Sequence, residues 1–173
     1  PYSNECAKAI KKAWDSISKE YSDLVLVLEG ANDEAIALCE DNRINLISAT
    51  GSTQMGKELA PIVSARLGKL LLELGGNNAA IVCPSANLDL TIKGIAFSAC
   101  GTTGQRCTSL RRLFVHEDIY DDCTNRLKKY FDDLVIGCPS KNTSQIGPLI
   151  SEKSFNAMQD TLNSLKDKDV RVI

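Results

Sequence analysis

Two spacings of hydrophobic residues alternate along the chain. Residues 5–20 place apolar side chains three and four positions apart, which predicts a helix with one apolar face. The next apolar run, LVLVLEG at 24–30, is continuous and predicts a strand buried on both faces, as in a parallel sheet. The same patterns predict further elements up to position 74: helices at 33–40 and 53–67, and strands at 44–48 and 69–74. This alternation is typical of crossover connections around a parallel sheet.

The pattern begins again after Gly75 and Gly76. Its expected elements are strands at 79–83, 112–116 and 134–137, and helices at 88–100, 117–132 and 151–168. A loop is expected at 138–148, and a last strand is expected to start at Val170. Because the chain opens on a helix with no strand before it and stops inside VRVI, we expect a fragment of two partial α/β domains, 1–74 and 75–173.

Composition limits the class of protein. With 43% hydrophobic and 24% charged residues the chain is typical of a soluble globular protein, and its net charge of -2 argues against a nucleic-acid partner. No apolar run approaches the roughly 20 residues that cross a bilayer, so neither a membrane partner nor a signal peptide is expected. We therefore expect an intracellular protein. Its seven cysteines include no CxxC pair, which favours reduced thiols and no metal site.

The stretch TGSTQMG at 50–56 joins a predicted strand to a predicted helix. A turn of small residues lets phosphate oxygens approach backbone N–H groups at the positive end of a helix, so the stretch suits a nucleotide. The alternative is purely structural: Gly51 makes a tight turn, Ser52 or Thr53 caps the helix, and Gly56 allows close packing. The spacing matches neither the GxGxxG fingerprint nor a P-loop, so both interpretations stay open.

An acid and a cysteine are the candidates for chemistry. Glu73 interrupts the apolar strand LLLELGG and either faces a polar site, where it would serve as a general base, or points from an edge strand into solvent. In ACGTTGQRCTS, small residues predict a sharp turn that leaves the N–H groups of Cys107 and Thr108 free to donate. Cys107 is then either a nucleophile or a buried structural thiol, a role for which Cys100 is the better candidate.

Taken together and in order, TGSTQMG, LELGGNNA and GQRCT resemble the motifs of the aldehyde dehydrogenase superfamily. LLELGGNNA, GTTGQRCT, RRLFVHE and NRLKKY are similar to the antiquitin-type branch, which oxidises alpha-aminoadipic semialdehyde in lysine catabolism. Asn77, Asn78 and Arg106 are the distinctive residues of that likeness. Arg106 would either help to ionise the neighbouring thiol or form a structural ion pair pointing away from it.

The resemblance implies a fold and a set of roles. Residues 1–74 would be part of a Rossmann-like NAD(P)-binding domain, and 75–173 part of the α/β catalytic domain. Cys107 would attack the aldehyde with its own N–H as half of the oxyanion hole, Glu73 would activate the hydrolytic water, and Thr108 would touch the substrate. The implied cofactor is NAD, with NADP as the alternative, and the implied cofactor-binding residues are Gly30, Ala31, Thr50, Gly51, Ser52, Thr53, Gly56 and Leu74.

The resemblance further implies an aldehyde substrate, a homodimer or homotetramer, and a cytoplasmic location, with the mitochondrion as the alternative in a eukaryote. The chain corresponds to only about a third of a full-length member. It lacks matches for the oxyanion-hole asparagine, the ribose-binding lysine and the E-x-F-x-P motif, and Ala49 replaces a usual phenylalanine. By itself the chain is therefore expected to be inactive.

Parts of the sequence are also compatible with two other functions. One is a truncated, non-catalytic module that binds a nucleotide or a partner. The other is a cysteine hydrolase built on Cys107 and the single histidine, His116. The hydrolase is disfavoured because it leaves Glu73 and the Gly51 turn without a role.

Overall fold

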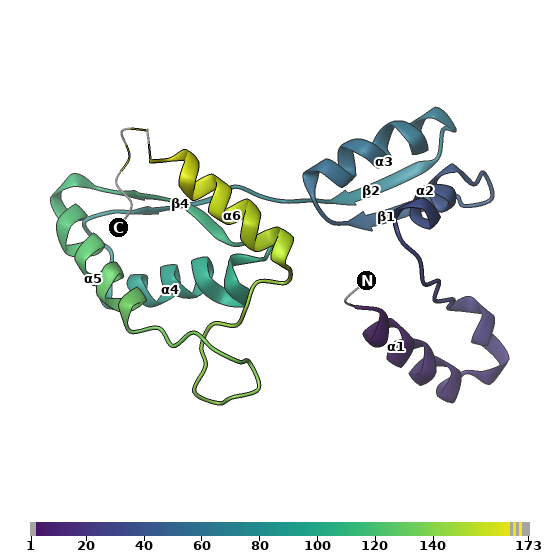
Figure 1. Ribbon diagram of the computed structural model, residues 1–173, viewed down its shortest axis with the longest axis horizontal. Coiled ribbons are helices and arrows are strands. Elements are labelled where there is room, and N and C mark those ends of the chain that lie inside the picture. The colour runs from purple at the N-terminus through teal and green to yellow at the C-terminus, as the bar shows by residue number, and fades with distance from the viewer. Residues whose placement is uncertain (1–2, 167, 169, 171–173) are drawn as a thin grey trace. The chain divides into compact units, whose positions relative to one another are not determined.

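The structure, a computed structural model, describes residues 3–166, 168 and 170. The chain divides into two compact units, Pro1–Leu74 and Gly75–Ile173, each of which contains helices and a parallel sheet (Figure 1). The fold is therefore α/β, as predicted. Each unit is described by itself.

The first unit is built on a two-stranded parallel sheet covered by a helix. Its elements are α1 (Asn4–Ile17), η1 (Lys19–Leu24), α2 (Asn32–Glu40), β1 (Leu46–Thr50), α3 (Thr53–Ala65) and β2 (Lys69–Glu73). Leu59 and Val63 of α3 pack with Cys39 of α2 to form the core. The half-buried Ile47 and Leu70 of the sheet lie against this core, so the apolar face of α3 is what the sheet buries.

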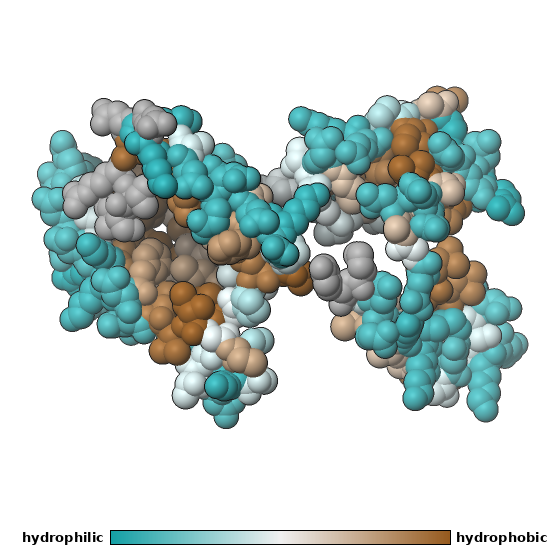
Figure 2. Space-filling view, in the orientation of Figure 1, coloured by the Kyte–Doolittle hydropathy of each residue, from teal (hydrophilic) through white to brown (hydrophobic). Residues whose placement is uncertain are grey.

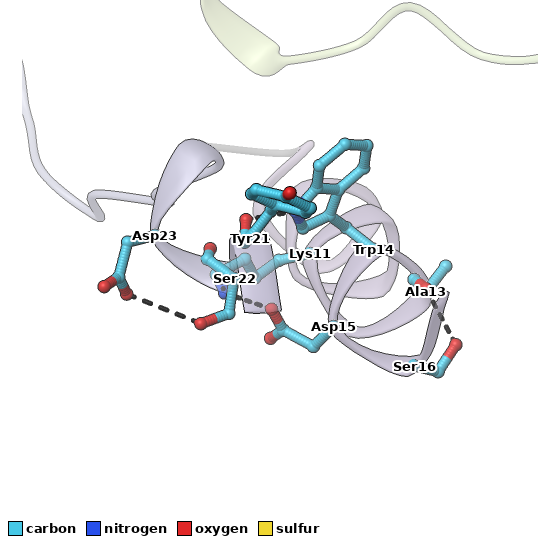
Figure 3. A network of polar contacts seen from close by, with 8 residues as sticks. All are labelled: Lys11, Ala13, Trp14, Asp15, Ser16, Tyr21, Ser22 and Asp23. Carbon is cyan, nitrogen blue, oxygen red and sulfur yellow. Dashed lines mark hydrogen bonds and ion pairs between the residues drawn. The ribbon is translucent and has the colours of Figure 1, made fainter. Parts of the chain in front are cut away.

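Helix α1 ends three residues before the predicted boundary because the backbone leaves the helical region at Ser18 (φ -134°, ψ 67°). Side chains of α1 then hold the returning chain, η1 (Figure 3). The indole Nε1 of Trp14 donates to the carbonyl of Tyr21 at 2.8 Å, and Lys11 donates to the carbonyl of Ser22 at 3.2 Å. The two elements thus form a small hairpin that these two hydrogen bonds hold together.

The predicted strand at 24–30 is wrong. These residues belong to no described strand, and Leu24, Leu26 and Leu28 are 70–73% exposed. A strand needs a neighbour that accepts and donates backbone hydrogen bonds, and the sheet of this unit consists of β1 and β2 alone within the described residues. High β-propensity without a partner leaves the run unpaired.

The second unit pairs β3 (Asn78–Val82) with β4 (Leu110–Val115) in parallel. Its other elements are α4 (Leu88–Cys100), η2 (Gly101–Gly104), η3 (Glu117–Ile119), α5 (Tyr120–Asp132) and α6 (Glu152–Ser164). Side chains from β3, α4 and α5 form the core: Val82, Ile92, Ile95, Cys123 and Leu127. The opposite face of the sheet is open, since the paired Ile81 and Phe114 are exposed, and hydrophobic surface is visible on this unit in Figure 2.

Of two further strands predicted in this unit, one is wrong and the other lies almost entirely outside the described residues. At 134–137 there is only an isolated parallel bridge between Ile136 and Ile146, because the partner segment is a loop too irregular to extend a ladder. The strand predicted from Val170 falls on residues 171–173, which lie outside the described residues, and Val170 itself is in no strand. None of the described helices combines the length and apolar character that a bilayer-spanning helix needs.

Candidate functional site

The carboxyl ends of β1 and β2 gather several of the predicted residues in the first unit. Thr50 and Glu73 are the last paired residues of these parallel strands, and the N–H of Gly51 donates to the carbonyl of Glu73 at 3.0 Å. The turn after Thr50 leads directly into α3. In open parallel sheets, ligands bind outside the carboxyl ends of the strands, so this edge is the candidate ligand site of the unit.

The first turn of α3 combines a cap with free donors. The Ser52 hydroxyl accepts a hydrogen bond from the N–H of Met55 at 3.1 Å, so the predicted capping role of Ser52 is confirmed. The N–H groups of Thr53 and Gln54 make no hydrogen bond within the described residues. Unpaired N–H groups at the positive end of a helix are what a phosphate oxygen needs.

Two glycines allow neighbouring side chains to lie close to the backbone of this turn. A Cβ on Gly56 would lie 2.5 Å from Cδ1 of Leu74, and a Cβ on Gly51 would lie 2.7 Å from the sulfur of Met55. Gly56 therefore lets α3 pack against the residue that follows β2. Both interpretations of TGSTQMG are compatible, because one face of the turn packs while its N–H groups stay open.

Gly30 and Ala31 lie at the start of α2 and line an open cavity of about 400 Å³. The N–H of Ala31 donates to Oε2 of Glu34 at 2.7 Å, and this bond lowers the pKa of Glu34. A hydrogen bond from Arg43 lowers the pKa of Asp41, which also lines the cavity, to about 2. Ionised carboxylates accept hydrogen bonds and repel anions, so this cavity suits sugar hydroxyls better than phosphates.

Glu73 lies on the exposed face of β2, together with Lys69 and Leu71. Its carboxylate is exposed among the described residues. Its position is nevertheless specific, because it ends the strand beside Thr50 and precedes Leu74 and the second unit. The exposure of Glu73 is compatible with both interpretations, a polar site that is open in this unit and an edge strand that faces solvent.

In the second unit, Cys107 lies on an exposed four-residue turn. The carbonyl of Arg106 accepts from the N–H of Ser109 at 3.2 Å, and the buried Ser109 hydroxyl accepts from the N–H of Arg106 at 3.1 Å. Cys107 and Thr108 occupy the two corners, and both are exposed. Their N–H groups donate to no acceptor in the described parts of the chain, as predicted. An accessible thiol beside two free donors has the parts of a nucleophile and an oxyanion hole.

The segment before this turn is strained. Thr102 (φ 55°) and Thr103 (φ 57°) are β-branched residues in the left-handed region, which costs about 1–3 kcal/mol each. Contacts to a distant loop hold them there: the Thr103 hydroxyl donates to the carbonyl of Gly147 at 3.0 Å, and Gln105 Oε1 accepts from the N–H of Ile150 at 2.8 Å. The predicted sharp turn is confirmed, but no sequence signal indicates that two threonines would adopt this conformation.

Arg106 is directed toward α4 and η2. Its Nε donates to the hydroxyl of Thr102 at 2.8 Å, and its guanidinium lies 5.3 Å from the ring centroid of Phe97. These contacts are structural, as in the second alternative for Arg106, but they involve a hydroxyl and an aromatic ring, and no described carboxylate forms the expected ion pair. They border a cavity of about 290 Å³ that Cys100 also lines. Burial raises the pKa of Cys100, which keeps that thiol protonated and supports its structural role.

The single histidine lies at the wrong end of β4 for a Cys–His pair. Cys107 precedes this six-residue strand and His116 follows it, so a rise of about 3.3 Å per residue separates them by more than about 16 Å. His116 instead caps η3, accepting the N–H of Asp118 at 3.3 Å. Across residues 3–166, 168 and 170, no group of three or more His, Cys, Asp or Glu side chains is placed to hold a metal ion.

Gly76 contacts the cysteine turn so closely that alanine will not fit. A Cβ at this position would lie 2.5 Å from the carbonyl oxygen of Cys107, which is backbone and cannot rotate away. We expect Gly76→Ala to destabilise the full-length protein by about 1–3 kcal/mol, as overpacking does, measured by urea unfolding. Gly94→Ala is the matched control, because an added Cβ there meets no atom within 4 Å. Equal stabilities of the two variants would contradict the close approach.

Comparison with known proteins now decides the family. The sequence profile described as "Aldehyde dehydrogenase family" matches residues 5–173. The chain belongs to this family. The chain is 42% identical to alpha-aminoadipic semialdehyde dehydrogenase from Bos taurus over 144 residues, which cover 83% of this chain and 27% of the relative. It is 39% identical to aldehyde dehydrogenase family 7 member A1 from Brassica napus, over 79% of this chain and 28% of the relative. It thus spans little more than a quarter of these relatives.

Solved structures agree with the family assignment. The NAD-dependent aldehyde dehydrogenase of Sinorhizobium meliloti matches 80% of this chain at 32% identity and a TM-score of 0.78, over 28% of its own chain. An NADP-dependent enzyme of Escherichia coli matches 85% at 32% identity and a TM-score of 0.79, over 31% of its own chain. The predicted family and fold class are therefore confirmed.

Proposed function

We propose that this chain carries the dinucleotide-binding turn and the nucleophile of an NAD(P)-dependent aldehyde dehydrogenase, which oxidises an aldehyde to a carboxylic acid. The observation that carries the proposal is the Cys107 turn, where an exposed thiol lies beside two N–H groups without acceptors among the described residues. Family membership supports it. In this proposal residues 1–74 are part of the cofactor-binding domain and residues 75–173 part of the catalytic domain.

The first unit fits a dinucleotide. The N–H groups of Thr53 and Gln54 at the start of α3, which have no acceptor among the described residues, would bind a pyrophosphate. The residues that would hold the cofactor are Thr50, Gly51, Ser52, Thr53, Gly56 and Leu74, with Gly30 and Ala31 on the adenosine side. When bound, NAD or NADP supplies the two-electron acceptor that the oxidation needs.

Three residues of the chain would act on the substrate. The Cys107 thiolate adds to the aldehyde carbon, and the N–H of Cys107 stabilises the oxygen that becomes negative. After oxidation the acyl group remains on the Cys107 sulfur as a thioester. Glu73 takes a proton from the water that hydrolyses this thioester, which releases the carboxylic acid and the free thiol. Thr108, at the other exposed corner of the turn, contacts the substrate.

The proposed substrate is alpha-aminoadipic semialdehyde, because relatives at 42% identity are named for its oxidation. We expect the full-length protein to reduce NAD or NADP in the presence of this semialdehyde, with kcat/KM at least about 10-fold above that for a simple aliphatic aldehyde of equal length. The formation of reduced cofactor, followed by absorbance, measures both rates.

The same assay separates the proposal from a non-catalytic nucleotide-binding module. Such a module would bind the cofactor without reducing it, whichever aldehyde is added. Equal kcat/KM values for the two aldehydes would retain the dehydrogenase and reject the semialdehyde as its preferred substrate.

A further inference from the structure

The pairing of β3 with β4 is interrupted just after the cysteine turn ends. Asn78 pairs with Leu110 and Ala79 with Arg112, so Arg111 is an extra residue at this end of the ladder. Before Leu110 the chain lies outside the sheet, and no backbone N–H of the described residues donates to the carbonyls of Cys107 and Ser109. The side-chain amide of Asn78 takes over there: its Nδ2 donates to the carbonyls of Cys107 at 2.7 Å and of Ser109 at 3.0 Å.

The first of these bonds acts on the central peptide of the turn. The carbonyl of Cys107 and the N–H of Thr108 belong to one planar peptide group and point in opposite directions. Type I and type II turns differ by a flip of this central peptide, and type II requires a positive φ at the third residue, here Thr108. Thr108 is not among the positive-φ residues of the structure, so its peptide has the orientation that the bond from Asn78 holds.

The other hydrogen bonds of the turn fix its ends and not its centre. Ser109 bonds both the N–H and the carbonyl of Arg106, and Nη2 of Arg111 donates to the same carbonyl at 3.3 Å. Among the described residues, Asn78 alone hydrogen-bonds the Cys107 carbonyl. Cys107 and Thr108 are exposed, and the Gly76 backbone packs against the Cys107 carbonyl without a hydrogen bond to it, so the bond from Asn78 is the directional restraint on this peptide.

We propose that Asn78 is a positioning residue for the nucleophile: its amide fixes the Cys107–Thr108 peptide, and with it the direction of the Thr108 N–H and of the Cys107 thiol. This inference rests on the proposed function of Cys107. Asn78 touches neither substrate nor cofactor in this role and acts only through the turn.

The test compares Asn78→Ala and Asn78→Asp in the full-length enzyme with Asn77→Ala. Asp has the shape of Asn but cannot donate while ionised. The Asn77 side chain makes no hydrogen bond in the described residues, since only its carbonyl is used, by Arg112. We expect both Asn78 variants to lower kcat about 10- to 100-fold, the cost of misplacing a reacting group. Asn77→Ala should stay within about twofold of the wild type by the same argument.

Two further measurements distinguish positioning from general destabilisation. The dissociation constant of the cofactor and the rate of Cys107 alkylation by iodoacetamide should both stay within about twofold, because the thiol remains exposed in either turn. Where Asn78→Ala does not fold, Asn78→Ser, which keeps one donor, should fold and show an intermediate loss of kcat. An unchanged kcat in Asn78→Asp, or a fall in kcat matched by weaker cofactor binding, overturns the proposal. Full activity of Cys107→Ser would instead overturn the function on which it rests.

Discussion

Replacing Cys107 by serine is expected to lower kcat/KM for aldehyde oxidation by at least about 10⁴-fold in the full-length enzyme. A serine hydroxyl is a weak nucleophile unless a neighbouring base removes its proton. Within the described residues no acidic, histidine or lysine side chain hydrogen-bonds to Cys107, and His116 lies at the other end of β4. The substitution keeps the shape of the turn, so cofactor binding should be unchanged. Steady-state kinetics and cofactor titration measure the two effects.

Cys138 is the matched control for this substitution. It is also exposed, and a hydrogen bond with Ser140 lowers its pKa, which favours the thiolate. A lowered pKa alone would therefore point to Cys138, whereas the free N–H groups of the turn point to Cys107. We expect Cys138→Ser to retain activity. Loss of activity in Cys138→Ser together with its retention in Cys107→Ser would reverse the assignment.

Most elements of the fold could be predicted because their patterns are local. Helix α3 begins at the predicted residue, since Ser52 caps it, and its apolar spacing fixes the face that covers the sheet. Strands β1 to β4 all lie within two residues of their predicted limits. Their parallel pairing followed from the helices between them.

The run at 24–30 shows where such patterns fail. Leu24, Leu26 and Leu28 have the composition of a buried strand, but burial depends on what lies beside them, and no described strand does. A strand forms only beside a neighbouring strand, so the sequence of one segment alone does not determine whether it becomes a strand.

The candidate site likewise contains residues that local motifs predict and residues whose role depends on distant contacts. Cys107, Glu73 and the α3 turn were found from motifs, because small residues and an acid within an apolar strand stand out in the sequence. Asn78 drew attention only as part of a family likeness, and its bond to Cys107 spans 29 positions. The left-handed threonines before the turn, held by the loop at 147–150, had no local signal at all. Contacts between distant segments therefore set the geometry of a site whose chemistry is locally encoded.

Glu73→Gln should separate the two halves of the reaction. Glutamine has the size of glutamate but cannot take a proton from water, so hydrolysis of the Cys107 thioester should slow about 10²- to 10⁴-fold. Formation of the thioester does not need this base. Rapid mixing of enzyme, cofactor and aldehyde should therefore give a stoichiometric burst of reduced cofactor followed by a slow steady state. Stopped-flow absorbance measures both phases.

The matched control is Glu40→Gln, an exposed carboxylate at the end of α2 that makes no hydrogen bond in the described residues, and it should leave burst and steady state unchanged. The position of Glu73 makes the outcome informative in either direction. Glu73 lies at the carboxyl ends of β1 and β2, next to the turn that we propose binds the cofactor. An effect of the substitution on cofactor binding would therefore appear as a higher dissociation constant of the cofactor. A burst that falls in proportion to the steady state would show that Glu73 acts before the thioester forms, as the base for the Cys107 thiol. Only a preserved burst with a slowed steady state assigns the hydrolytic water to Glu73.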